Sequence, residues 1–455
     1  MLLIRGLSYV VTYDDAGREL SDADILVDGR TIAAVGAGLS DDGVERVLDG
    51  RGLIALPGLV NAHQHLYEAV LRAVPELERA SMGRWLDGIG ELGIRWWRQG
   101  RLGRDTVREV ARAVLLESLL GGVTTVADQH YFFPGGKPGG YVEATIEAAM
   151  DVGVRLHAAR SSITLGKHEG GHADDLFVED VQSVVRHCAE LIERYHDPRP
   201  LSRIRIALGP CGVHVDLPET FESLAALAAD HEQVRLHTHL YEKVDTEICL
   251  DLHGMTPWRF LEKHGWANER VWVAHAVDPP AHEIPEFAAA GVRVTHLIAP
   301  DLRLGWGIAP VRAMLDAGVT VGFGTTGSGS NDGANLLGDL RVAALAHRPA
   351  IPDPQRWLTA RELFRMATRG SADCLGRPDL GSLAPGKAAD IACWDLTGID
   401  RVGIHDPLIG LLMTGLSDKA SLVLVDGEVL VEDGNATRVD VEAVARLARS
   451  MAPVG

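Results

Sequence analysis

The chain has 455 residues, of which 46% are hydrophobic and 24% are charged, a composition typical of folded globular proteins. This length suffices for one large domain with an accessory domain, or for two domains. The formal net charge is -19, from 44 Lys and Arg against 63 Asp and Glu. Such an acidic balance disfavours nucleic acid and anionic membranes as partners, because both require a basic surface.

The five cysteines form no CxxC pair and are odd in number, which indicates reduced thiols and a cytoplasmic protein. Acidic residues follow the first apolar stretch of the chain, and no small-residue cleavage site is present. We therefore interpret the N-terminus as a pair of strands rather than a signal peptide. Apolar runs also fall short of the ~20 residues that a membrane-spanning helix needs.

Both ends of the chain show the alternation of strands. Residues 24–36 contain two such runs around an Asp-Gly turn, and residues 422–431 repeat the pattern. Neither end has enough strands to bury a face alone. We expect residues 1–55 and 378–440 to pair into one small β-sandwich, with 441–455 forming a C-terminal helix or tail.

Residues 56–377 have a different pattern, in which short apolar runs alternate with helical stretches such as 106–120 and 220–229. Eight runs are strand candidates: 54–60, 124–128, 154–159, 204–208, 234–239, 271–275, 292–296 and 320–324. Eight strand–helix units predict an α/β fold with a (β/α)8 TIM-type barrel, whose active site lies at the carboxyl ends of the strands. A doubly wound sheet would instead be expected to carry a glycine-rich phosphate loop after its first strand, and residues 57–65 contain no such loop.

Histidines follow the first predicted barrel strand. His63 and His65 are two positions apart, so in an extended chain both imidazoles point to the same face. A lone HxH pair is weak evidence, because surface or capping histidines are common. Its position directly after an apolar strand and a Pro-Gly pair favours a functional role.

Further polar residues end the fifth and sixth predicted strands. His239 and His275 stand at the strand ends, and Glu242 follows three residues after the first of them. His237 shares the direction of His239 but lies deeper, so packing or support is its expected role. Buried imidazoles need partners, which makes this set hard to assign to packing alone.

A catalytic zinc ion suits these residues, because neutral imidazoles with one open position for water are typical of catalytic zinc sites. We predict one Zn2+ per chain. Iron or manganese is also compatible with imidazole ligands, so the choice of zinc rests on the ligand type.

The chain resembles the cytosine/guanine deaminase-like branch of the amidohydrolase superfamily along nearly its whole length. The resemblance is carried by residues 57–65, 239–242, 274–275, 300–310, 324–331 and 386–394. Four segments are more similar to the s-triazine hydrolases (atrazine chlorohydrolases) of that branch: 63–68, 124–130, 158–162 and 324–328.

This resemblance implies a barrel with a β-sandwich, one catalytic metal and a homodimer. His63, His65 and His239 would be the metal ligands. Glu242 would carry the proton, and His275 would bind or orient the water, which leaves open whether it is a fourth ligand.

Two positions depart from the family pattern. Deaminases of this branch carry Gly-Thr-Asp-Gly after strand eight, where this chain has Thr326 in place of the aspartate. A degenerate, inactive site is the alternative interpretation. We favour a catalytic role in which Thr326 orients the water, because a cation held only by neutral imidazoles acidifies bound water more strongly. At the second position, the family more often has asparagine where this chain has Asp301, which is expected either to contact substrate or to cap a loop.

The predicted reaction is attack of metal-bound hydroxide on an s-triazine-like N-heteroaromatic ring, displacing chloride, methylthio, methoxy or amino groups. Trp85, Gln129, Asp301 and Trp306 are the predicted substrate contacts. The alternative is deamination of a purine, pterin or pyrimidine base by the same residues. A cyclic-amide hydrolase would normally use a lysine on strand four, and 204–211 contains none.

Overall fold

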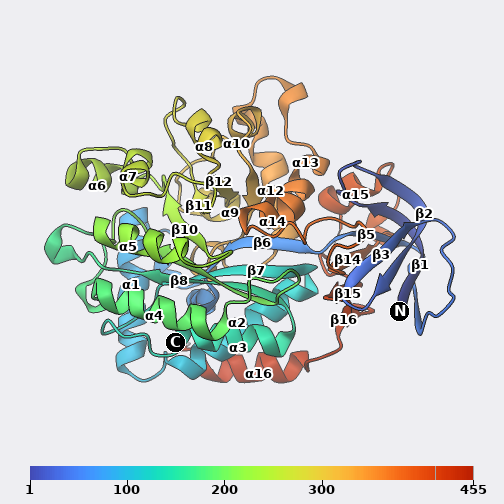
Figure 1. Ribbon diagram of the computed structural model, residues 1–455, viewed down its shortest axis with the longest axis horizontal. Helices are drawn as coiled ribbons and strands as arrows, with labels where there is room; N and C mark the ends of the chain where they lie inside the picture. Colours follow the sequence, from blue (N-terminus) through green and yellow to red (C-terminus); the bar gives the residue numbers. More distant parts are fainter. Residues whose placement is uncertain (416, 454–455) are drawn as a thin grey trace.

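Two sheets organise the chain in the computed structural model, which describes residues 1–415 and 417–453. One is the predicted eight-stranded parallel barrel and the other is a separate sheet built from both ends of the chain (Figure 1). The fold class predicted from the sequence is confirmed.

The barrel strands pair in chain order, each parallel to the next. They are β6 (Leu59–Gln64), β7 (Val123–His130), β8 (Arg155–Ser162), β9 (Ile204–Pro210), β10 (Arg235–Leu240), β11 (Val271–His275), β12 (Arg293–His296) and β13 (Val321–Phe323). Between the last and first strands, the Thr326 amide donates to the His63 carbonyl at 3.0 Å. This bond links the segment after β13 to the carboxyl end of β6.

Helices cover the outside of the barrel (Figure 1). The helices of this part of the chain, including α11 and α14 at the two ends of the barrel, are α1 (Met82–Arg98), α2 (Arg104–Leu120), α3 (Tyr141–Val152), α4 (Val181–Tyr195), α5 (Pro218–Ala229), α6 (Val244–His253), α7 (Pro257–Lys263), α8 (Ile284–Ala290), α9 (Ile298–Arg303), α10 (Val311–Asp316), α11 (Ser328–Asn331), α12 (Leu336–Ala346), α13 (Ala360–Arg365) and α14 (Ser371–Cys374). A 3-10 helix, η1 (Leu66–Leu71), directly follows β6.

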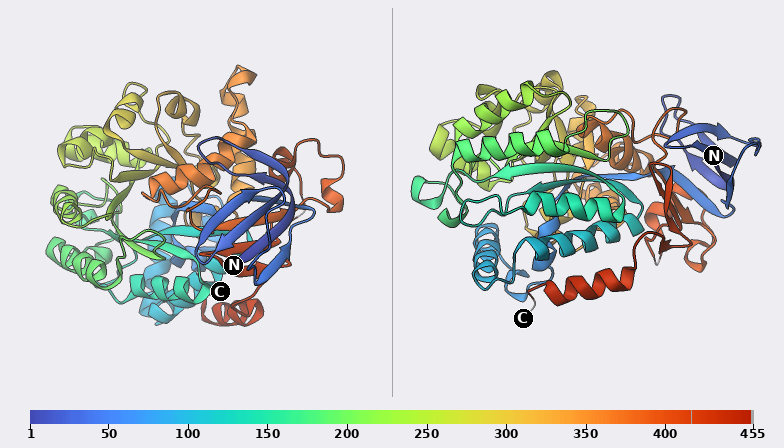
Figure 2. Two further views of the ribbon diagram at one scale, coloured as in Figure 1. Left: turned by 45° about the vertical axis from the view of Figure 1, so that its right-hand side comes forward. Right: turned by 60° about the horizontal axis from the view of Figure 1, so that its bottom comes forward.

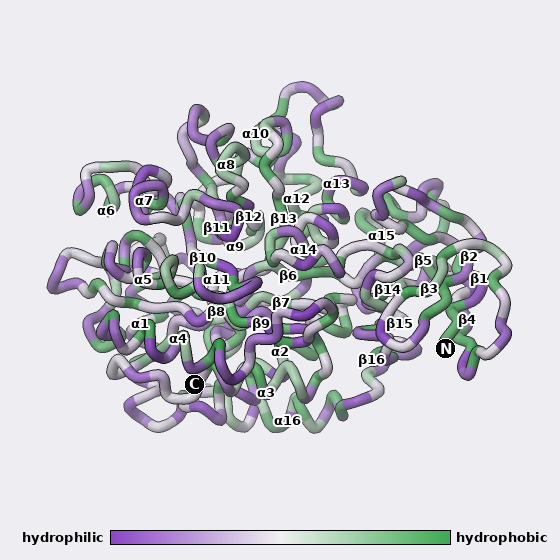
Figure 3. Tube along the Cα trace, in the orientation of Figure 1, coloured by the Kyte–Doolittle hydropathy of each residue, from purple (hydrophilic) through white to green (hydrophobic). Residues whose placement is uncertain are grey.

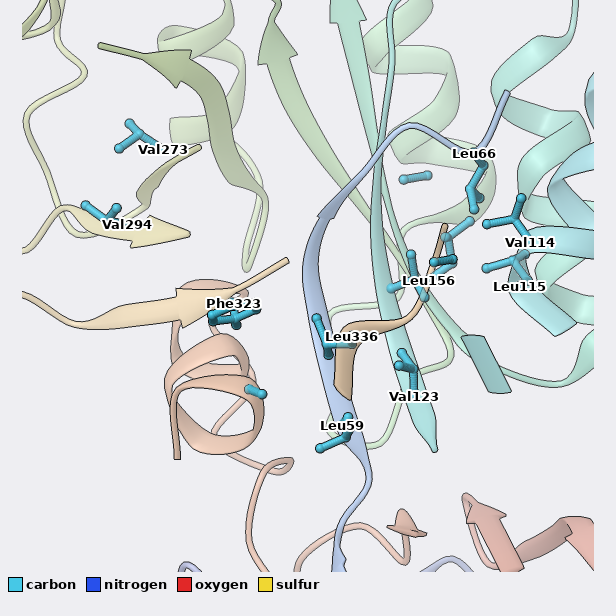
Figure 4. Close-up of a cluster of buried hydrophobic side chains, with 14 of the residues drawn as sticks. Leu59, Leu66, Val114, Leu115, Val123, Leu156, Val273, Val294, Phe323 and Leu336 are labelled. Atoms are coloured by element: carbon cyan, nitrogen blue, oxygen red, sulfur yellow. The ribbon is translucent and has the colours of Figure 1, made fainter. Parts of the chain in front are cut away.

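The core lies between strands and helices. Val114 and Leu115 of α2 belong to one buried cluster with Leu66, Val123 and Leu156, drawn in Figure 4. The buried residues of α2 recur at helical spacing, so they form one apolar face of the helix. This face packs against β7, whose residues are all buried. In Figure 3 the stretch of α3 is coloured hydrophobic, whereas the connections around α6 and α7 are mostly hydrophilic.

The second sheet has nine strands in the order β17-β16-β15-β14-β5-β1-β2-β3, with β4 beside β1. They are β1 (Leu2–Val11), β2 (Glu19–Asp28), β3 (Thr31–Gly36), β4 (Arg46–Asp49), β5 (Leu53–Pro57), β14 (Ile391–Asp395), β15 (Leu422–Val425), β16 (Glu428–Glu432) and β17 (Asn435–Ala436). Ile25 and Val27 share a buried cluster with Ile391 and Leu424, so side chains from the two ends of the chain pack in one sandwich core.

The predicted run 54–60 differs from the structure, because it divides between the two sheets. β5 pairs with β14, whereas β6 pairs with β7. The chain passes between the sheets at Gly58, where a Cβ would lie 2.3 Å from Thr124 side-chain atoms. A side chain does not fit there, and the apolar pattern of the sequence does not reveal this break. The domain boundaries at 55, 378 and 440 remain predictions.

A buried ion-pair cluster joins the two parts. Arg155 at the start of β8 donates to both oxygens of Asp390 at 2.8 and 2.9 Å and to Asp426 at 2.9 Å. Further along the chain come α15 (Pro407–Met413) and α16 (Val441–Met451). α16 leaves the sheet and packs along α2 of the barrel, as the right-hand view of Figure 2 shows. None of the described helices combines the length and apolarity needed to cross a membrane.

Candidate active site

A cavity of about 200 Å³ opens at the carboxyl ends of the barrel strands. His65 after β6, His239 on β10, His275 at the end of β11 and Thr326 after β13 all line it. His63 lies directly below and is fully buried. The structure thus brings together the four histidines that the sequence places at strand ends.

A chain of hydrogen bonds fixes the His63 imidazole. The ring of His237 stacks on Trp272 at 4.2 Å, and its Nδ1–H donates to the Trp272 carbonyl at 2.8 Å. Burial lowers the pKa of His237 to about 3, so its Nε2 carries a lone pair that accepts from His63 Nδ1 at 2.8 Å. His63 therefore directs the lone pair of Nε2 away from this bond, and that buried atom has no hydrogen-bond partner among the described residues.

The other two predicted ligands are held in the same way, each by a backbone carbonyl. His65 Nδ1 donates to the Gln129 carbonyl at 2.7 Å, and His239 Nδ1 donates to the Cys211 carbonyl at 2.6 Å. Burial lowers the pKa of His65 to about 3 and that of His239 well below its usual range. Both rings are therefore neutral, with their Nε2 lone pairs facing each other at 3.2 Å.

Two lone pairs at this distance repel each other unless a cation lies between them. Zinc binds histidine nitrogen at about 2.0–2.1 Å, which places two nitrogen ligands of a tetrahedral ion about 3.3 Å apart. The Nε2 pair of His65 and His239 and the unpartnered Nε2 of His63 fit that requirement. Ligand atoms of His63, His239 and His275 also lie within 4.8 Å of one another. The site therefore fits one zinc ion.

His275 and Glu242 form the polar wall beside this cluster. Asp301 accepts from His275 Nδ1 at 2.7 Å, and the opposite nitrogen of the ring lies 3.6 Å from Glu242 Oε1. Asp245 fixes the backbone of the glutamate, because its carboxylate accepts from the amides of Tyr241 at 2.6 Å and Glu242 at 2.7 Å. Burial, then Asp245 and Asp301, raise the pKa of Glu242 well above its usual range, which favours the protonated acid.

Thr326 has an unusual backbone conformation for its residue type. Its φ is +54°, in the left-handed region that β-branched residues rarely adopt. The bond from its amide to the His63 carbonyl holds the residue there. Strain of this kind costs on the order of 1–3 kcal/mol and persists where the surroundings hold the conformation.

Two of the four predicted substrate contacts line the cavity. These two residues are Trp85 and Trp306. The indole N–H of Trp306 is buried and has no hydrogen-bond partner among the described residues. Gln129 and Asp301 lie outside the cavity lining and contact the histidines instead. Sequence reasoning placed these two residues beside the site but did not identify which atoms they contact.

Glu68 is a buried acid near the cavity to which the sequence analysis assigned no role. Tyr131, which lines the cavity, donates from its hydroxyl to Glu68, and the Gly329 amide donates to the other oxygen at 3.1 Å. Tyr131 also meets His65 edge-to-face at 4.9 Å. Burial raises the pKa of Glu68 to about 7. Its burial, rather than any pattern in the sequence, marks it as part of the site.

Comparison with known proteins adds a family match. A model described as the amidohydrolase family matches residues 54–430, which is most of the chain. The chain is 34% identical to 8-oxoguanine deaminase of Pseudomonas aeruginosa, over 96% of this chain and 95% of that protein. It is 35% identical to hydroxydechloroatrazine ethylaminohydrolase of Pseudomonas sp. strain ADP, over 98% and 94%.

Solved structures show a higher similarity. The atrazine chlorohydrolase from Arthrobacter aurescens TC1, complexed with zinc, has 66% sequence identity and a TM-score of 0.98, with 100% of both chains covered. A mutant of it complexed with zinc and atraton has 65% identity, the same TM-score and the same coverage.

We expect His63→Ala, His65→Ala and His239→Ala each to lower the zinc content of the purified protein from about one ion per chain to below about 0.1, because each removes one of a small set of ligands. Metal analysis by mass spectrometry is the measurement. His264→Ala is the control, since that imidazole bonds Glu222 instead. Full zinc content in any of the three ligand variants would contradict the assignment.

Proposed function

The chain belongs to the amidohydrolase family, and from that we propose that it is a zinc-dependent hydrolase that displaces a substituent from an s-triazine-like N-heteroaromatic ring. The observation that carries this proposal is the set of neutral histidines whose Nε2 lone pairs converge below a small cavity beside a buried glutamate. The similarity to zinc-bound atrazine chlorohydrolase supports the s-triazine class of ring.

His63, His65 and His239 hold the metal in this proposal. Bound zinc lowers the pKa of a coordinated water, so that a nucleophile is available near neutral pH. Gln129 and Asp301 act as positioning residues, since the first fixes His65 through its carbonyl and the second fixes His275 through its carboxylate.

Glu242 supplies the proton. As a carbon–oxygen bond forms at the electron-poor ring carbon, electron density moves to the adjacent ring nitrogen, and Glu242 gives its proton to that nitrogen. The ring regains its aromatic system when the substituent leaves with the electron pair of the broken bond and the ring nitrogen gives its proton back to the Glu242 carboxylate. A methylthio, methoxy or amino group takes that proton from Glu242 as it departs, whereas chloride leaves without one. His275, 3.6 Å from Glu242, is placed to orient the attacking water together with Thr326.

The cavity suits a flat ring of modest size. Trp85 and Trp306 supply apolar walls, and the Trp85 indole is itself fixed by a bond to the Gly329 carbonyl at 3.0 Å. The free N–H of Trp306 is available to a ring nitrogen or a substituent. A few polar groups in an apolar pocket are typical of small-molecule sites.

Deamination of a purine, pterin or pyrimidine base is the second candidate. Its support is the identity of about a third to an 8-oxoguanine deaminase and to an ethylaminohydrolase. Against it stands Thr326, because an amine must be protonated before it leaves and this position lacks the aspartate of the deaminase pattern.

We also propose that the enzyme is a cytoplasmic homodimer. The five cysteines are free and buried, in keeping with a reducing compartment. The dimer rests on the resemblance to the family.

A panel of chloro-, methylthio-, methoxy- and amino-s-triazines, with guanine, cytosine and pterin as comparison substrates, tests the proposed function. We expect kcat/KM to be highest for good leaving groups and lowest for amines. Glu242→Gln should lower kcat by about 10²–10⁴-fold, because general acid catalysis contributes that much. The loss should be largest for weak leaving groups.

The exposed Glu247→Gln is the matched control for this panel, since it makes the same chemical change five residues after Glu242, outside the cavity lining. Turnover of the bases with none of the triazines would contradict the proposal and favour the deaminase. An unchanged rate in Glu242→Gln would show that Glu242 is not the acid.

Substitutions at Thr326 distinguish a site in which this residue orients the attacking water from a degenerate deaminase site. Thr326→Asp adds a carboxylate at the cluster, and we expect turnover of a chloro-s-triazine to fall by about 10²-fold or more. Thr326→Ser keeps the hydroxyl and should lose far less.

Aspartate adopts positive φ more readily than threonine, so backbone strain does not account for a loss in Thr326→Asp. Steady-state kinetics on one chloro- and one amino-s-triazine measure both variants. A gain for Thr326→Asp on both substrates would overturn the assigned role.

A further inference from the structure

Arg235 is a buried cation that the proposed reaction does not use. It lies on β10 two residues before His237 and four before His239, so all three side chains point into the barrel. Its side chain is at the amino-terminal end of the strands, opposite the cavity. Only 8% of the residue is exposed, and Nε and Nη2 are buried without a hydrogen-bond partner.

A second arginine reaches the same turn of the chain. Arg205 on β9 donates from Nη1 to the Gly376 carbonyl at 3.3 Å. A Cβ on Gly376 would lie 3.0 Å from Nη1 of Arg235, so both guanidinium groups adjoin Gly376. This turn follows α14, which lies on the side of the barrel that faces the terminal sheet (Figure 1).

Two of the carboxylates near this face are bound to other arginines. Asp379 bonds Arg377 at 2.7 and 3.0 Å, and Asp390 bonds Arg155. Within the part of the chain that the structure describes, Arg205 bonds only Ser202 and backbone carbonyls. Among the described residues, no carboxylate forms an ion pair with Arg235. The negative charge of Glu269 raises the pKa of Arg235 through space, without an ion pair between the two side chains.

Burial, then the neighbouring Arg293, lower the pKa of Arg235 to about 9, so the guanidinium is still charged at neutral pH. A buried unpaired charge is strongly unfavourable, and arginine does not relieve it by losing its proton. A buried water can satisfy single N–H groups, but a counter-ion from solution also neutralises the charge. Guanidinium groups bind small anions through several parallel N–H donors.

We propose that the amino-terminal face of the barrel holds a small inorganic anion, bound by Arg235 with Arg205 beside it. The site is separate from the catalytic cavity, because Arg235 lies at the other end of β10 from His239. The anion neutralises the buried guanidinium and stabilises the fold by mass action. It requires no change in the proposed reaction.

Thermal unfolding of the zinc-loaded protein tests this site at constant ionic strength, with gluconate as the balancing anion and with chloride and phosphate titrated separately. We expect the wild-type Tm to rise by about 2–4 °C and to saturate with at least one of the two anions. Arg235→Met keeps the side-chain volume and should show no such rise. In gluconate alone its Tm should equal or exceed that of the wild type, because the unpaired charge is gone.

The exposed Arg348→Met is the control for general salt effects, and it should respond to both anions as the wild type does. Bromide soaked into wild-type crystals gives an independent measurement that needs no variant. An anomalous peak within hydrogen-bond distance of Arg235 supports the site. Absence of that peak, or equal Tm responses in wild type and Arg235→Met, would overturn the proposal. A peak without any effect on Tm would mean an adventitious ion only.

Discussion

The site depends on one repeated interaction, a hydrogen bond from each histidine Nδ1 to an acceptor held by the barrel. The acceptors are the Gln129 carbonyl for His65, the Cys211 carbonyl for His239, the His237 ring for His63 and the Asp301 carboxylate for His275. In His63, His65 and His239 the bond selects one tautomer and leaves Nε2 as a lone pair. Because burial keeps the His63, His65 and His239 rings neutral, their lone pairs converge without protons to separate them, and this arrangement creates a site for a cation.

The parallel strands of the barrel supply these acceptors, because each strand end lies beside the next. The bond that links β6 to the segment after β13 also positions Thr326, one of the two residues that depart from the family pattern. The Thr326 amide donates to the His63 carbonyl while the residue is in the left-handed conformation. The architecture and the leaving-group preference that we propose are therefore linked through a single strained residue.

Strand-end histidines were predictable, because residues at spacing two in an extended chain share a face and apolar runs mark where each strand lies. The break at Gly58 was not, since it depends on the close approach of Thr124 and leaves no mark in the apolar pattern. Gln129 and Asp301 were placed near the site, but tertiary contacts decide that they hold histidines rather than line the cavity. Glu68 and Arg235 became visible only through burial, because their sequence neighbours do not distinguish a buried charge from an exposed one.

Metal-to-nitrogen coupling tests the converging lone pairs most directly. Protein labelled with ¹⁵N-histidine and loaded with ¹¹³Cd in place of zinc gives scalar couplings that identify each bound nitrogen by nuclear magnetic resonance. The account predicts coupling to Nε2 of His63, His65 and His239, with protons retained on their Nδ1 atoms. Coupling to Nδ1 in any of the three, or no coupling to His65, would contradict it.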